Sequence, residues 1–151
     1  MNRSKSMTFA TIAAGLAACS PGPERHYDRD PALSADLPFS SAVVVGDTIF
    51  LSGEIGRAPG STSLVSGGVA AETRQIFQNY ERTLARVGAS LKDIVKCTVF
   101  LEDMKDYAAM NAAYAEFFPG DKPARSTFGV DGLAFGAALE IECLAARGGK
   151  S

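Results

Sequence analysis

Apolar and polar residues alternate along the chain with two different periods, and each period predicts a different element. Residues 42–52 are mostly apolar, and the turn dipeptide Gly46-Asp47 interrupts them, which predicts a β-hairpin. Between residues 69 and 87 the apolar side chains return every three or four positions, which predicts an amphipathic helix. The segment between them, residues 54–68, is rich in glycine and predicts a loop with a short strand at 63–65.

The second half of the chain continues with one helix and three strands. Strands are predicted at residues 94–101, 125–130 and 138–147, and a helix at about 104–118, which is followed by Pro119-Gly120. The resulting order, β-β-(β)-α-β-α-β-β, predicts an α+β domain in which two helices cover one face of a single sheet.

Two of the predicted strands have one apolar and one mixed face, because side chains alternate across the pleat. In strand 138–147 the apolar face holds Leu139, Ile141, Cys143 and Ala145, and the mixed face holds Glu140, Glu142, Leu144 and Ala146. In strand 94–101 the apolar face holds Val95, Cys97, Val99 and Leu101, and the mixed face holds Lys96, Thr98 and Phe100. The mixed face is too apolar for open solvent and too charged for a dry core, so we expect another copy of the chain to cover it.

Charge and cysteine content exclude two classes of function. The chain has 15 Lys and Arg against 17 Asp and Glu and no basic run, so we expect no nucleic-acid partner. One His and three Cys without CxxC or HxxxH spacing predict no metal site. Cys97 and Cys143 lie inside apolar strand patterns, where a free Cys acts as a small hydrophobe, so we expect no disulfide between them.

The N-terminus has the features of an export signal. Arg3 and Lys5 precede twelve uncharged residues, 7–18, which are too few to span a bilayer. They end in Leu16-Ala17-Ala18-Cys19, which looks like a bacterial lipobox with Cys19 as the lipidated residue. We therefore expect an exported, periplasmic, membrane-anchored lipoprotein. A soluble periplasmic product of ordinary signal cleavage, or a disordered tail, is the alternative.

These features divide the chain into three parts. Residues 1–18 are predicted to be a signal peptide and residues 37–148 the folded domain. Residues 19–36, rich in Pro, Gly and charge, are predicted to be a flexible tether.

The candidate functional residues lie on the last two predicted strands and on the second predicted helix. Arg125 follows Pro123-Ala124 at the entry of a strand, and its planar fork of donors suits a carboxylate. Glu140 on the last strand is a candidate general base that could hold a water. Alternatively, Arg125 pairs with Glu140 or Glu142. Asn111 is a polar residue on an apolar helix face, which is costly unless it is hydrogen-bonded, either at the site or to a loop.

Motifs over about residues 37–147 resemble the RidA/YjgF family of reactive imine and enamine deaminases. The C-terminal signature consists of Pro123-Ala124-Arg125-Ser126, Phe128, Leu133 and Leu139-Glu140-Ile141-Glu142. Further matches are Pro38-Phe39, Val45-Gly46-Asp47, Leu51-Ser52-Gly53-Glu54-Ile55, Asp93-Ile94-Val95-Lys96, Met110-Asn111-Ala112-Ala113-Tyr114 and Phe117-Phe118. Two positions differ from the family: enzymatically proven members commonly have Tyr where Phe39 stands, and a small or basic residue where Asp131 stands.

The resemblance implies a chorismate-mutase-like fold and a homotrimer whose sheets form a central barrel, with clefts between subunits and no cofactor. It implies hydrolysis of 2-imino and enamine acids, of the 2-aminoacrylate type, to 2-keto acids and ammonia. Arg125 would bind the substrate carboxylate, Glu140 would position the attacking water, and backbone near Thr127 would help to hold it. Phe39, Ser52, Gly53 and Asn111 would line the cleft. A binding module for small carboxylates without turnover, or a holdase-like protein, is the alternative.

Overall fold

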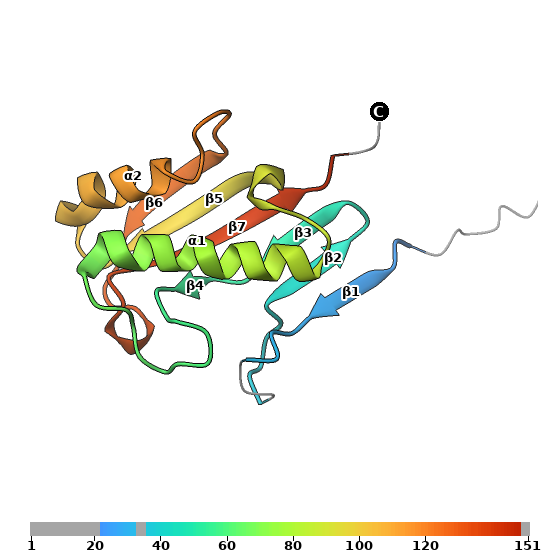
Figure 1. Cartoon of the computed structure of the whole chain (residues 1–151), viewed down its shortest axis with the longest axis horizontal. Coiled ribbons are helices and arrows are strands. Elements are labelled where there is room, and N and C mark those ends of the chain that lie inside the picture. Colours follow the sequence, from blue (N-terminus) through green and yellow to red (C-terminus); the bar gives the residue numbers. More distant parts are fainter. Residues whose placement is uncertain (1–21, 33–35, 149–151) are drawn as a thin grey trace, which may run out of the picture.

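One mixed sheet forms the domain, and both α-helices cover the same face of it (Figure 1). The computed structural model describes residues 22–32 and 36–148. The strands are β1 Arg25–Asp28, β2 Ala42–Val45, β3 Thr48–Leu51, β4 Glu54–Ile55, β5 Ile94–Leu101, β6 Ala124–Gly129 and β7 Leu139–Ala146. The α-helices are α1 Gly68–Arg86 and α2 Tyr107–Ala115, and short 3-10 helices lie at Leu91–Asp93, Met104–Asp106 and Ala134–Gly136.

The strand order of the sheet is β1-β2-β3-β7-β5-β6, and β4 also pairs with β7. Only β5 and β6 run parallel, and α2 makes the crossover between them. The other pairs are antiparallel. These features confirm the expected α+β fold and leave β1 and β6 at the two edges of the sheet.

The core lies between the helices and the sheet, and the spacing of apolar residues along each element determines which side chains are buried there. On α1, Ile76, Phe77, Tyr80 and Leu84 recur at helical spacing and are at most 1% exposed. Along β7 burial alternates strictly, as the sequence predicts, with Leu139 and Ile141 fully buried. Burying each such apolar side chain contributes about 1.5–3 kcal/mol.

The prediction that Val95 lies on the core face is wrong. The ladder between β5 and β7 shifts register between Ile94 and Lys96, so β5 contains a bulge at Val95. Ile94 is therefore 5% exposed, and Val95 is 50% exposed. The regular alternation that the sequence suggests resumes at Cys97.

The expectation that Cys97 and Cys143 remain unbridged is also wrong. The two residues are direct partners in the antiparallel β5–β7 ladder, with a Cα–Cα distance of 4.1 Å, and they form a disulfide. Strand periodicity places both on the core face, but the register that puts them opposite each other depends on tertiary pairing.

The segment predicted to be a flexible tether contains strand β1, so that prediction is wrong for residues 25–28. β1 pairs with β2, and Arg86 of α1 donates to Asp28 at 2.8 Å and pairs with Asp30 at 3.2 Å. The strand is short and polar, so its sequence carries no apolar pattern. The folded domain therefore begins before residue 37.

The predicted signal peptide, residues 1–18, and the predicted lipidation site at Cys19 lie outside the described residues. Across residues 22–32 and 36–148, no helix combines the length and the apolar character that crossing a bilayer requires.

Candidate functional site

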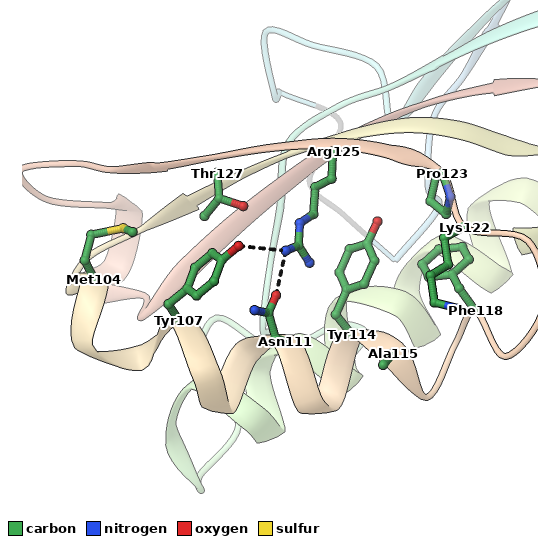
Figure 2. A pocket seen from close by; sticks show the side chains of 10 residues that line it. All are labelled: Met104, Tyr107, Asn111, Tyr114, Ala115, Phe118, Lys122, Pro123, Arg125 and Thr127. Carbon is green, nitrogen blue, oxygen red and sulfur yellow. Dashed lines mark hydrogen bonds between the residues drawn. The ribbon is translucent and has the colours of Figure 1, made fainter.

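Arg125 projects from edge strand β6 toward helix α2 (Figure 2). Its ladder partner on β5 is Cys97, whose partner on β7 is Cys143. Ladder partners point to the same face of a sheet, and both cysteines belong to the core under the helices. The strand pairing therefore directs Arg125 to the helix side.

Helix α2 holds the guanidinium group of Arg125 with two polar side chains. Nη2 donates to Oδ1 of Asn111 at 2.6 Å and to the hydroxyl of Tyr107 at 3.3 Å (Figure 2). Tyr107 and Asn111 lie four residues apart, so both point to the same side of the helix. Hydrogen bonding with Asn111, and then with Arg125, lowers the pKa of Tyr107. The expected bond of Asn111 is present, and its partner is Arg125.

Aromatic rings complete the surroundings of Arg125. Its Cζ lies 4.7 Å from the ring centroid of Tyr114 and 5.8 Å from that of Tyr107, both within cation–π range. Nη1 makes one long contact, 3.9 Å, to Sδ of Met110. The Tyr114 side chain is buried, and burial raises its pKa to about 12.

These side chains line a cavity of about 590 Å³ between α2 and β6. Its lining residues are Met104, Tyr107, Asn111, Tyr114, Ala115, Phe118, Lys122, Pro123, Arg125 and Thr127. Arg125 stands in the middle of the view in Figure 2, with Tyr107 and Asn111 on one side and Tyr114 on the other. The cavity thus presents a fixed cation in a largely apolar and aromatic wall, which suits a small organic acid.

Glu140 lies on the opposite face of the sheet. It is three residues before Cys143 on β7, and its ladder partner on β5 is Phe100. Burial first, and the neighbouring carboxylate of Glu142 second, raise the pKa of Glu140. A carboxyl group with a raised pKa is suited to accept a proton.

The Glu140 carboxylate packs against the backbone of Gly53. Ser52 and Gly53 connect β3 to β4. Both strands pair with β7, β3 with residues 144–146 and β4 with residues 140–141. A Cβ atom at Gly53 would overlap Oε1 of Glu140. The missing side chain at Gly53 therefore leaves the room that the carboxylate occupies.

The remaining predicted residues fall into these two groups. Thr127 lines the Arg125 cavity. Ser52, next to Gly53, donates from Oγ to the carbonyl of Ser40 at 2.6 Å, and Phe39 precedes Ser40 with 47% exposure. The structure thus brings Arg125, Asn111 and Thr127 together on one face, and it brings Glu140 and Gly53 together on the other.

The alternative ion pair of Arg125 with Glu140 or Glu142 is not formed. Both glutamates lie on the mixed face of β7, which points away from α2. Because Arg125 points toward α2, the sheet itself separates the charges within one copy of the chain.

Sequence reasoning missed Tyr107, Tyr114 and Lys122 as lining residues. Tyr107 and Tyr114 flank Asn111 at helical spacing, and this pattern also fits an ordinary core face. A second cavity, of about 720 Å³, lies between α1 and the segment that follows α2. None of the residues predicted to form the functional site lines it. Among the residues that the structure describes, no three His, Cys, Asp or Glu side chains are grouped to hold a metal ion.

The chain matches a family model and several curated relatives. The model described as Endoribonuclease L-PSP matches residues 30–147. The chain is 41% identical over 111 residues to human 2-iminobutanoate/2-iminopropanoate deaminase, covering 74% of this chain and 81% of the relative. It is 34% identical over 142 residues to the chloroplastic Reactive Intermediate Deaminase A of Arabidopsis thaliana, covering 94% and 74%.

Solved structures have the same fold. Yeast Mmf1 superposes with a TM-score of 0.75 at 35% identity and covers 82% of this chain and 98% of that one. RidA from an Antarctic Psychrobacter superposes with a TM-score of 0.73 at 33% identity and covers 80% and 97%. With the motifs, the fold and the family model in agreement over most of its length, the chain belongs to the Endoribonuclease L-PSP family, which is the RidA/YjgF family that its sequence resembles.

Proposed function

We propose that the protein hydrolyses reactive 2-imino acids, and the enamines that tautomerise to them, to 2-keto acids and ammonia. The observation that carries the proposal is the Arg125 cavity, where Asn111, Tyr107 and Tyr114 fix a guanidinium group in an aromatic wall. Relatives 34–41% identical to this chain are named deaminases of such substrates.

The chemistry needs few protein groups. The carbon of a 2-imino acid is electrophilic, so water adds across the C=N bond: a C–O bond forms, the π bond to nitrogen breaks, and the nitrogen takes one proton from the water. The resulting carbinolamine passes its hydroxyl proton to the amino group as the C–N bond breaks, which releases ammonia and leaves the 2-keto acid. Orientation of the acid and a placed water are sufficient, and no covalent nucleophile is required. A charge-assisted hydrogen bond from Arg125 to the substrate carboxylate would contribute about 1.5–3 kcal/mol, or about ten- to a hundredfold in rate.

Glu140 is proposed to hold the attacking water, and it would come from a second copy of the chain. The argument is geometric, because one copy directs Arg125 and Glu140 to opposite faces of its sheet. A ring of three copies, each placing its mixed face near the β6 edge of the next, would bring the two groups into one cleft. The exposed apolar side chains of the mixed face favour such an assembly: Phe50, Phe128 and Leu144 are 46%, 54% and 37% exposed.

A coupled assay tests the activity. An amino-acid oxidase generates 2-imino acids, the domain is added, and release of ammonia and 2-keto acid is followed against buffer. We expect acceleration by the parent protein and about ten- to a hundredfold less with Arg125→Ala. Parental rates are expected with Arg74→Ala, an exposed arginine outside the cavity that pairs with Glu116. No acceleration by the parent protein, with thermal stabilisation by 2-keto acids, would instead indicate a binding module without turnover.

Export as a lipoprotein is proposed on separate grounds. The lipobox-like residues 16–19 suggest it, and the Cys97–Cys143 disulfide is of a kind that persists in oxidising compartments such as the periplasm. Palmitate labelling of the expressed full chain tests the proposal. We expect label in the parent chain and none in Cys19→Ser, and equal label in both would reject it.

A further inference from the structure

The hydroxyl of Tyr114 is buried without a hydrogen-bond partner among the described residues. Tyr114 is 6% exposed, and Figure 2 shows its hydroxyl pointing away from α2 toward β6, beside the Arg125 side chain. Leaving a buried hydroxyl unpaired costs free energy, so each such group in a folded protein calls for an explanation.

Tyr80 shows what a purely structural tyrosine looks like in this fold. It is 1% exposed, and its hydroxyl is hydrogen-bonded to the backbone carbonyls of Ser52 and Ile141. The core therefore can satisfy a buried tyrosine hydroxyl, and it does so where the side chain only ties α1 to the sheet. Tyr114 differs because its hydroxyl faces the cavity that contains Arg125.

One of the two terminal nitrogens of Arg125, Nη2, already donates its hydrogen bonds to side chains of α2. Nη2 carries two protons, and they are directed to Asn111 and Tyr107. An incoming acid can therefore accept a hydrogen bond from Nη1 without breaking these bonds. Bidentate binding of its carboxylate by Nη1 and Nη2 would require Nη2 to give up one of its partners. In Figure 2 the terminal nitrogen without dashed lines is the one on the Tyr114 side.

We propose that Tyr114 is a substrate-binding residue, whose hydroxyl donates a hydrogen bond to one carboxylate oxygen of the bound acid while Nη1 of Arg125 donates to the other. The identity of the acid as a 2-imino or 2-keto acid rests on the proposed function. The carboxylate then lies between Arg125 and Tyr114, on the side of Arg125 where Figure 2 also shows Pro123.

This arrangement leaves the Arg125 bonds to Asn111 and Tyr107 intact. It also gives the Tyr114 hydroxyl a hydrogen-bond partner in the bound acid. The guanidinium group of Arg125 lies over the Tyr114 ring, with Cζ 4.7 Å from the ring centroid. The acid must therefore draw the two side chains slightly apart as it enters. Tyr114 contributes to binding in the ground state, so its loss should raise KM more than it lowers kcat.

The test compares Tyr114→Phe with Tyr27→Phe in the full chain, using 2-oxobutanoate as the probe in titration calorimetry. The Phe substitution keeps the ring that stacks on Arg125 and removes only the hydroxyl. Tyr27 is 58% exposed on β1 and serves as the matched control. We expect Tyr114→Phe to bind 2-oxobutanoate about tenfold more weakly and Tyr27→Phe to bind as the parent does.

A second readout separates a binding role from a structural one. Because Tyr114→Phe removes an unpaired buried group, its melting temperature without ligand should be equal to or above that of the parent, while its stabilisation by 2-oxobutanoate should be smaller. Parental affinity in Tyr114→Phe, or no binding of 2-oxobutanoate by the parent, would overturn the assignment. If the parent binds the acid but does not hydrolyse imines, the proposed activity fails, and the calorimetric comparison still decides the role of Tyr114.

Discussion

Arg125 and Glu140 point to opposite faces of one sheet, with strand β5 between their own strands. Arg125 shares the face of its ladder partner Cys97, whereas Glu140 shares the face of Phe100. A general base acts within about 2.6–3.2 Å of the proton that it accepts, or through one water. One copy of the chain therefore cannot apply both groups to the same small substrate, and the proposed reaction requires a neighbour.

Mixing two inactive variants tests this requirement. Arg125→Ala and Glu140→Gln should each lose most activity, because each removes one of the two groups from every cleft of the proposed homotrimer. In a trimer reassembled from equal amounts of both, about a quarter of the clefts combine an intact Arg125 from one copy with an intact Glu140 from the next. Imine hydrolysis should then recover to about a quarter of the parental rate.

The control for this experiment carries both substitutions in one chain. Mixed with either single variant, the double variant leaves one of the two groups missing from every cleft, so no activity should return. Recovery in this control, or none in the first mixture despite subunit exchange shown by native mass spectrometry, would contradict a cleft shared between copies.

Gly53→Ala should displace the Glu140 carboxylate, because the added methyl group would overlap its Oε1 atom. Misplacing a reacting group by about 1 Å can cost about a hundredfold in rate, so we expect a loss of about that size. Gly120→Ala is the matched control, since a Cβ there meets no atom within 4 Å. Circular dichroism should be parental for both variants, and a Gly53→Ala enzyme with parental rates would argue against Glu140 in the reaction.

The pH dependence of the rate should reflect the raised pKa of Glu140. A general base must be deprotonated, so the rate should fall as pH drops through a pKa that burial, and then Glu142, hold above the ordinary value of 4.5. Glu142→Gln removes the smaller of these causes, so the acid limb should move to lower pH without reaching the ordinary value. A pH–rate profile of both proteins measures the shift, and a limb that moves to higher pH would refute the assignment.

Reducing the Cys97–Cys143 disulfide should destabilise the domain. The bond joins residues 46 positions apart, and a closed loop of this length restricts the unfolded chain by about 4 kcal/mol in the chain-entropy model. We expect dithiothreitol to lower the urea midpoint of the parent protein and to leave that of the double variant Cys97→Ala/Cys143→Ala unchanged. A parental midpoint that does not respond to reductant under denaturing conditions would indicate that the bond is absent in solution.

Several elements follow from local pattern alone. The helical spacing of Ile76, Phe77, Tyr80 and Leu84 predicts α1, and the alternation along β7 predicts which of its residues are buried. These predictions hold because the periods of a helix and a strand are fixed by backbone geometry, whatever the element packs against. The choice of Arg125 as the candidate cation likewise required only its residue type, its strand-entry position and the family motif.

Other features depend on which strands pair, and in which register. The bulge at Val95, the disulfide partner of Cys97 and the polar strand β1 all arise from contacts between segments far apart in the chain. The same pairing decides that Arg125 faces α2 while Glu140 faces away. Residue types and periodicities are properties of short segments, so the sequence determined them. Register is a property of two segments at once, because it is set by the packing of the whole sheet, and only the tertiary structure decided it.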